Sequence, residues 1–387
     1  MKPINRMSPW QIILGAVATA AVMRIGIKVA ADRERHRPTA MVDWSAAVQL
    51  AQRMLPAMHQ PNSYNYQALA DAAGEDVARL TGLTIPVGAL QVRVVDQQTW
   101  LQANIRSFAR LMSPLEPMWL AQHDQSDWGL ATRRVNGRVA GIQSGAMLSW
   151  MATRVLGQYD TALLHDDDAP NELLLVEPNI ARIANEQRVN VADLRQWIVI
   201  HEVSHVFQFE GVAWLRPHLR VLMDRFMQTL AAQLESPHDG VLSMVRRVTA
   251  QSATQSWIEW ALDDAQRAIF YEMQVLMSLI EGHSNYVMNQ IGAQKISTFG
   301  QLHQRMEARQ HERPTLDSLI MRVTGMQMKM AQYRDGEAFI TALAAHGGDA
   351  LVRYLWTTPA HLPTAAELAN PGAWIRRYAG TRDAYDS

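Results

Sequence analysis

Apolar residues recur every three or four positions through most of the chain, and polar residues fill the positions between them. This periodicity is typical of helices with one buried face. It predicts helices over residues 44–55, 65–83, 97–112, 138–156, 190–211 and 268–292. Most of the chain is therefore expected to be helical.

Strand patterns are few. Gln91–Val95 is one candidate, and Asp160–Leu164 and Leu173–Val176 flank an acidic turn, which predicts a hairpin. Leu173–Val176 has two interpretations: a buried core strand, which we favour, or a strand that lines a cleft and pairs with an extended peptide. The sequence thus predicts a mainly α fold with a small β-hairpin or sheet beside the helix at 190–211.

The N-terminal segment differs from the rest. Residues 10–23 form an apolar run, shorter than the ~20 residues that span a bilayer, and Arg24 and Lys28 follow it on one helix face. Three interpretations stay open: a helix packed on this chain or a partner, an anchor or interfacial helix that contacts a membrane through residues 10–30, and a signal peptide.

Basic residues are concentrated after this run rather than before it. If the run is an anchor, the positive-inside rule keeps the larger C-terminal part in the cytoplasm. We therefore expect a cytoplasmic protein, with membrane association through the N-terminal helix left open. Residues 1–40 are expected to form this helix and a basic linker, and residues 41–387 a single domain.

The amino-acid composition limits the kinds of catalytic and metal-binding site that the chain can form. The chain has no cysteine, which excludes disulfides, thiol nucleophiles and cysteine-built metal sites. Any metal must be bound by His, Asp or Glu, and there are 13 histidines to draw on. The net charge of -1 lacks the basic excess of a nucleic-acid-binding protein, so we expect no nucleic-acid partner.

One motif carries clear chemistry. Residues 201–205 read His-Glu-Val-Ser-His. On a helix, His201 and His205 are one turn apart on one face, where both can bind one Zn²⁺ at ~2.0–2.1 Å. Glu202 lies one step round the helix, beside the metal, where a carboxylate can take a proton from water and pass it to a leaving amine. We predict one zinc per chain, with Glu202 as the catalytic base.

The third protein ligand must come from another segment, because the metzincin pattern requires glycine at 208 and histidine at 211, and Gln208 and Gly211 stand there. Glu281 is the most interesting candidate. It follows a largely apolar stretch of helix, where a carboxylate is costly to bury unless paired or metal-bound. Gly282 beside it allows close approach of another helix. A glutamate at the rim, solvated or paired with arginine, is the alternative. The other candidates are Glu210, Glu235, Glu259, Glu272 and His283.

Four further residues are candidates for contacts around the metal or the substrate. Gln208 stays on the zinc-binding face and either hydrogen-bonds a ligand or the substrate, or packs in the core. Asn285 shares a face with Glu281 and could orient it. His283 lies about 200° round the helix from Glu281, which argues against binding of the same ion and leaves open a contact with a metal ligand or the substrate. His283 and Tyr286 are both candidates to stabilise an oxyanion.

Several blocks of the chain resemble one known family. The segments HEVSHVFQFEGVAWLR, LMSLIEGHSNYVMN and MQMKMAQYRDGEAFI are similar to signature blocks of the zincin-like metallopeptidase type 2 family, which is loosely associated with deazaflavin-coenzyme biosynthesis. The resemblance extends over residues 42–380. It implies a predominantly helical, zincin-like fold and a mononuclear zinc site, with His201, His205 and Glu281 as ligands and Glu202 as the base.

These observations predict a zinc-dependent metallopeptidase that hydrolyses peptide or amide bonds, with a peptide or protein as its partner. The alternative is a non-catalytic protein that keeps the zincin scaffold to bind a metal or a partner. A Glu202→Gln substitution distinguishes them, since only the enzyme needs that carboxylate.

Overall fold

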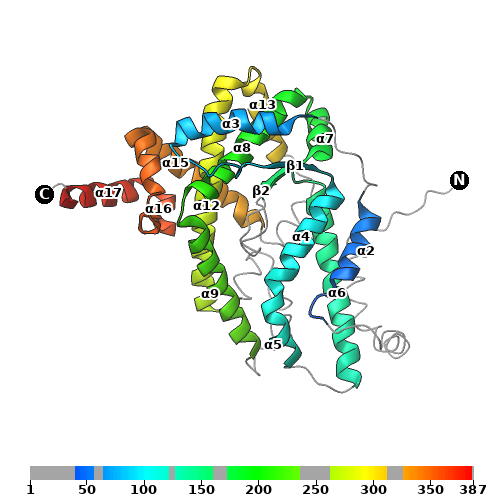
Figure 1. The fold of residues 1–387 in the computed structure, drawn as a ribbon. Helices are drawn as coiled ribbons and strands as arrows, with labels where there is room; N and C mark the ends of the chain where they lie inside the picture. The colour runs from blue at the N-terminus through cyan, green and yellow to red at the C-terminus, as the bar shows by residue number, and fades with distance from the viewer. Residues whose placement is uncertain are drawn as a thin grey trace.

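The computed structural model describes residues 40–55, 64–121, 127–159, 172–235, 262–311 and 326–385. The N-terminal segment 1–39, with its three interpretations, lies outside these ranges. Within them the chain is mainly helical with one three-stranded sheet, which confirms the predicted fold class (Figure 1). None of the helices in the described ranges is both long enough and apolar enough to cross a membrane.

The elements follow one another closely along the chain. They are α2 (Trp44–Met54), α3 (Tyr66–Thr81), β1 (Val92–Val95), α4 (Gln97–Met112), α5 (Glu116–Ala121), α6 (Asp127–Ala152), β2 (Gly157–Tyr159), β3 (Leu173–Val176), α7 (Glu177–Gln187), α8 (Val191–Gly211), α9 (Leu215–Glu235), α12 (Asp264–Lys295), α13 (Phe299–His311), α15 (Met326–Leu355), α16 (Ala365–Ala369) and α17 (Pro371–Tyr385). The helix predicted over residues 138–156 is α6, which begins earlier, at Asp127, and also ends earlier, at Ala152, before β2.

The sheet has the strand order β1-β3-β2. β3 pairs with β1 in parallel and with β2 antiparallel, so both of its edges are occupied. The idea that Leu173–Val176 adds a peptide strand is therefore wrong, because its backbone groups already bond to two neighbours. The hairpin partner of β3 is also different: it is Gly157–Tyr159, and the predicted segment Asp160–Leu164 lies outside the described residues.

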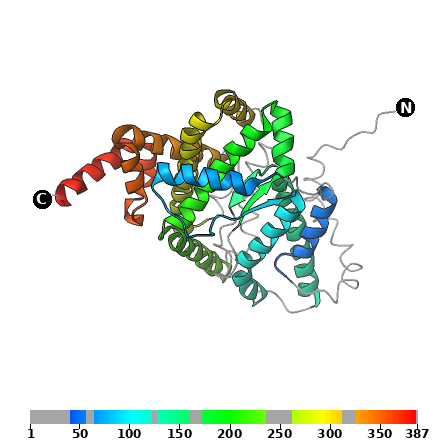
Figure 2. The same cartoon turned by 45° about the horizontal axis from the view of Figure 1, so that its top comes forward.

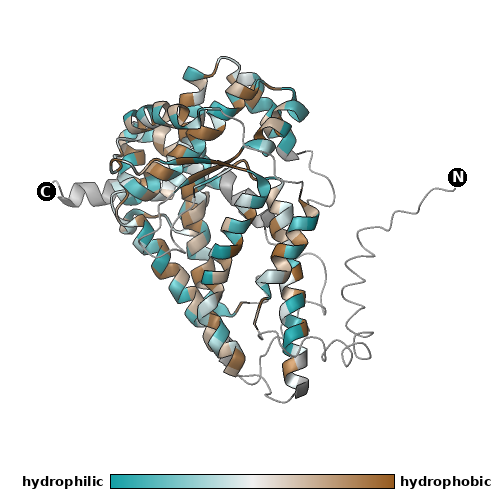
Figure 3. Cartoon of the chain, turned by 45° about the vertical axis from the view of Figure 1, so that its right-hand side comes forward, coloured by the Kyte–Doolittle hydropathy of each residue, from teal (hydrophilic) through white to brown (hydrophobic). Residues whose placement is uncertain are grey.

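β3 separates two hydrophobic clusters. Leu173 and Leu175 belong to the larger one, with residues of α3, α7, α8, α12 and α15, whereas Leu174 and Val176 belong to the smaller one, with α2, α4 and α6. This alternation follows from the period of two in a strand. All four residues are buried, which explains why this strand is an unbroken apolar run and stands out as hydrophobic in Figure 3.

Three helices of the larger cluster are packed against one another beside the sheet: α8 contacts α12, and α12 contacts α15 along its length. Figure 2 shows α3 lying across α8. The contact between α12 and α15 is backbone on backbone at Gly282 and Gly336. A β-carbon at 282 would lie 2.2 Å from the carbonyl carbon of Gly336. Gly282 therefore permits the close helix approach that the sequence predicted.

Candidate metal centre

Three potential ligand atoms meet between α8 and α12. His201, His205 and Glu281 each offer one atom, and these atoms lie within 4.8 Å of one another. The Nε2 atoms of the two histidines are 3.1 Å apart, and Oε2 of Glu281 lies 3.6 Å from one and 3.7 Å from the other. Tetrahedral zinc with ~2.0–2.1 Å bonds separates its ligand atoms by about 3.3–3.4 Å. The group therefore fits a zinc ion and leaves a fourth position open.

Each of these side chains is held in place by the helix that carries it. Asn190 caps α8 by accepting hydrogen bonds from the backbone N–H groups of Ala192 and Asp193. The helix then continues without a break past both histidines, and their rings lie 4.7 Å apart between centroids. Glu281 comes from the middle of α12, which packs against α8. The carboxylate reaches the histidines because two long helices cross there.

The other candidates for the third ligand lie elsewhere. Glu210 is hydrogen-bonded by Tyr159 and pairs with Arg216, and Glu272 pairs with Arg225 at 3.4 Å on the surface. Glu235 is the last residue of α9, and its side chain lies outside the described part of the structure. Glu259 lies outside the described part of the chain. Of the candidates that can be placed, Glu281 is therefore the one brought to the histidines.

Gln208 determines which nitrogen of His205 carries the proton. Its Nε2 donates to the carbonyl of Ile280 at 2.9 Å and to Nδ1 of His283 at 3.0 Å. Its Oε1 therefore faces Nδ1 of His205 at 3.1 Å and accepts from the hydroxyl of Ser284 at 3.0 Å. An amide oxygen can only accept, so Nδ1 of His205 holds the proton and Nε2 keeps its lone pair for a metal.

The carboxylate of Glu202 is buried beside this group, only 8% exposed. The backbone N–H of Tyr159 donates a hydrogen bond to it, which ties β2 to α8. Burial raises the pKa of Glu202 to about 7; the charge of Glu281 adds to the rise, and His201 and the Tyr159 N–H oppose it. A bound cation would lower this pKa. A carboxyl group whose pKa is near neutral can both accept and return a proton.

The electrostatic potential at His201 is negative, because several carboxylates surround it. Burial by itself would lower the pKa of this imidazole, but the hydrogen bond to Glu281 and the charges of Glu202, Glu281 and Glu337 raise it overall. Glu337 follows Gly336 on α15, at the glycine contact with α12. Carboxylates around two imidazoles favour a bound cation, which agrees with the spacing of the ligand atoms.

The remaining predicted residues are only partly brought to the centre. His283 is buried and contacts Gln208, and burial lowers its pKa to about 3, so its ring is neutral. The hydroxyl of Tyr286 donates to Asp349 at 3.3 Å, in a cavity that none of the three metal-binding residues lines. Asn285 is half-buried one turn after Glu281, so its predicted role in orienting Glu281 stays a prediction. Its neighbour Ser284 contacts His205.

Sequence reasoning missed four contributors: Ser284, Gly157, Glu337 and the backbone of Tyr159. Gly157 alone had a local signal, because a glycine in a strand often marks close approach of another group. A β-carbon there would lie 2.6 Å from Cγ of Glu202. The other three act through contacts between distant segments, which no local pattern reveals.

Comparison with known proteins places these features in a family. A family model described as zincin-like metallopeptidase matches residues 42–375. A solved structure from Chloroflexus aurantiacus, described as "a putative hydrolase with a novel fold", is 33% identical, with a TM-score of 0.65, over 87% of this chain and 99% of that chain. No curated protein matched. All of the metal-binding candidates fall within the matched range, and the chain belongs to the family of zincin-like metallopeptidases.

Proposed function

We propose that this protein is a zinc-dependent metallopeptidase that hydrolyses peptide or amide bonds, with one zinc per chain. The observation that carries the proposal is the tetrahedral spacing of His201, His205 and Glu281 with the buried carboxylate of Glu202 beside them. Family membership supports it, and so does the description of the similar Chloroflexus structure as a hydrolase.

Each side chain then has a defined task. His201, His205 and Glu281 would hold the zinc, which when bound supplies Lewis acidity that polarises a carbonyl group and acidifies water. Gln208 keeps the proton of His205 on Nδ1, away from the metal-binding nitrogen. Glu202 accepts a proton at its carboxylate from the attacking water and delivers it to the nitrogen of the leaving amine.

The position of β2 supports a peptide as substrate. Among the described strands, β2 is at the edge of the sheet, and β3 occupies only one side of it. Its other side meets Glu202 through Gly157 and Tyr159. An extended peptide that lies along this strand would present its carbonyl groups next to the base, without using the Tyr159 N–H that already donates to Glu202.

The test is a Glu202→Gln variant assayed against a library of peptides with mass-spectrometric detection of products. We expect hydrolysis to be lost while zinc content stays at one per chain, because glutamine removes the proton acceptor and leaves the three ligands in place. Glu186→Gln is the matched control, since Glu186 is an exposed residue on α7 that pairs with Arg182.

Two outcomes would overturn the proposal. Undiminished hydrolysis by Glu202→Gln would show that another group acts as the base. A zinc-loaded wild-type protein that cleaves no peptide in the library would favour the non-catalytic alternative, in which the scaffold binds a metal or a partner.

A further inference from the structure

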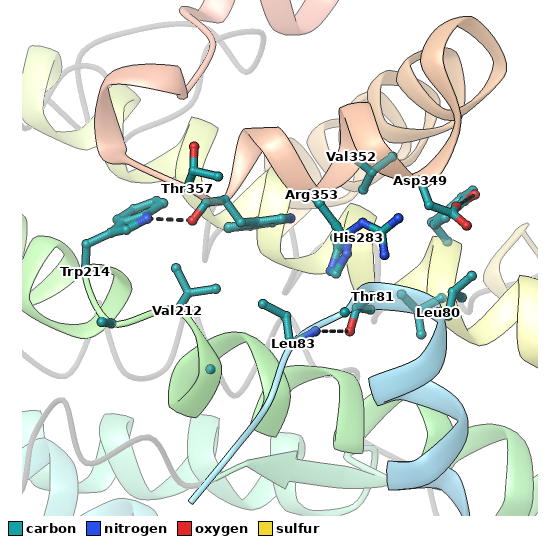
Figure 4. Close-up of a pocket in the computed structure, with 16 residues that line it drawn as sticks. Leu80, Thr81, Leu83, Val212, Trp214, His283, Asp349, Val352, Arg353 and Thr357 are labelled. Carbon is teal, nitrogen blue, oxygen red and sulfur yellow. Dashed lines mark hydrogen bonds between the residues drawn. The ribbon is translucent and has the colours of Figure 1, made fainter.

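A cavity of about 290 Å³, shown in Figure 4, has none of the three metal-binding residues in its lining. It is enclosed by the end of α3, the segment between α8 and α9, α12, and the second half of α15. Pockets for drug-sized ligands have volumes of about 300–1,000 Å³, so this cavity matches a small molecule. Its lining contains two opposite charges, a histidine N–H donor and an apolar wall.

The two charges belong to Asp349 and Arg353, one turn apart on α15. Oppositely charged residues at this spacing commonly pair, yet the described residues show no ion pair between them. Arg353 instead lies against the backbone of Gly82, where Cδ and Nη1 would be 3.0 Å from an added β-carbon. Asp349 accepts one side-chain hydrogen bond, from Tyr286. Both charges are therefore available to a ligand.

The N–H donor comes from His283. Since Nδ1 of His283 accepts from Gln208, the ring proton is on Nε2, for which no hydrogen bond is found among the described residues. The indole Nε1 of Trp356 also has no hydrogen-bond partner in the described structure, but this atom is fully buried and closed off from the cavity. An N–H without an acceptor is unfavourable, which favours a ligand that brings one to His283.

The wall opposite Asp349 is apolar. The rings of Trp214 and Trp356 are stacked with centroids 6.3 Å apart, and Val212 and Leu83 lie beside them. Figure 4 shows Trp214 and Asp349 at opposite ends of the cavity, with Arg353 and His283 between them. A ligand that spans the cavity would thus meet a carboxylate, then a group of donors, then an apolar surface.

We propose that this cavity binds a free α-amino acid with an apolar side chain. Its ammonium group would lie beside Asp349, and its carboxylate would face Arg353 and the Nε2–H of His283. Its side chain would pack against Trp214. Binding of this kind needs no turnover, so its test is independent of the proposed hydrolysis.

The test is calorimetric titration of the full-length protein with three probes of equal size class. L-phenylalanine carries both charges, N-acetyl-L-phenylalanine lacks the ammonium group, and L-phenylalaninamide lacks the carboxylate. We expect phenylalanine to bind and each analogue to bind about tenfold or more weakly, because each loses a charge-assisted contact. No binding of phenylalanine, or equal binding of the N-acetyl form, would overturn the proposal.

Variants decide where phenylalanine binds. Arg353→Gln should weaken binding by about tenfold or more, and Arg376→Gln, an exposed arginine on α17 outside the cavity, should not. An amino acid can also chelate zinc, and such binding would survive Arg353→Gln; that result would overturn the proposal. Asp349→Asn provides a second test: it should weaken phenylalanine binding and leave the weak binding of N-acetyl-L-phenylalanine unchanged. Thermal unfolding verifies that each variant is folded.

Discussion

Gly157 of β2 lies directly against the carboxylate of Glu202 on α8. A β-carbon at position 157 would be 2.6–2.7 Å from Cγ, Cδ and Oε1 of the glutamate, a separation that real side chains do not adopt. The next residue but one, Tyr159, donates its backbone N–H to the same carboxylate. The backbone of a short strand therefore positions the proposed base, 45 residues further along the chain.

Gly157→Ala should reduce peptide hydrolysis on the order of a hundredfold. The added methyl group must push either the Glu202 side chain or β2 out of place, and a shift of about 1 Å in a catalytic group can cost that much. Zinc content should stay at one per chain, because the methyl group meets the base rather than a ligand. The measurement is the initial rate on the best peptide from the library, together with zinc by mass spectrometry.

Gly300→Ala is the control for this prediction. Gly300 lies in α13, and an added β-carbon there meets nothing within 4 Å. Its activity should equal that of the wild type. A Gly157→Ala enzyme with full activity would show that the carboxylate of Glu202 does not need this position.

Replacing a metal-binding residue should remove the zinc. His205→Ala and Glu281→Ala each delete one of the three ligand atoms, so we expect zinc content to fall from about one per chain to near zero after dialysis. Glu272→Ala is the matched control on α12, because Glu272 pairs with Arg225 at the surface. Zinc that is lost in His205→Ala but retained in Glu281→Ala would show that the third ligand is a different residue.

Gln208→Leu should weaken zinc binding while leaving all three ligands in place. Without the amide, Nδ1 of His205 keeps only the Ser284 hydroxyl as an acceptor, and the carbonyl of Ile280 loses the donor from Gln208. Hydrogen bonds to a residue that binds the metal typically contribute 10- to 100-fold to metal affinity. Competition against a chromogenic chelator measures the dissociation constant, and the exposed Gln304→Leu serves as control. An unchanged constant would contradict the role assigned to Gln208.

A buried charge network should contribute strongly to stability. Glu177, at the start of α7, pairs with Arg195 of α8 and accepts the hydroxyl of Tyr66 of α3, and all three residues are buried. Glu177→Gln leaves the guanidinium without an opposite charge, which should lower the free energy of unfolding by about 3–5 kcal/mol.

Chemical denaturation of this variant beside Glu186→Gln gives the comparison. Glu186 pairs with Arg182 where both side chains are largely exposed, so its loss should cost about 1 kcal/mol or less. Equal effects of the two substitutions would show that burial does not strengthen the Glu177 pair.

The sequence by itself determined the features that depend on local spacing. The cap at Asn190 and the interval between His201 and His205 follow from the geometry of one helix, so both could be predicted without knowledge of the fold. The cost of burying a lone carboxylate in an apolar helix indicated Glu281, and Gly282 beside it indicated a close helix contact. Strand patterns were weaker, since short strands carry little periodicity.

Tertiary structure decided what depends on contacts between distant segments. The partner of β3 proved to be Gly157–Tyr159, and its pairing on both edges excluded the role of a peptide-binding strand. Ser284, which no local pattern indicated, contacts His205, because the packing of α12 on α8 sets which residue of α12 faces the histidine. The sequence does not indicate that Asp349 and Arg353 line a cavity, because that cavity is formed by four segments that are distant along the chain. Such contacts arise from packing between distant segments, and local residue patterns do not predict that packing.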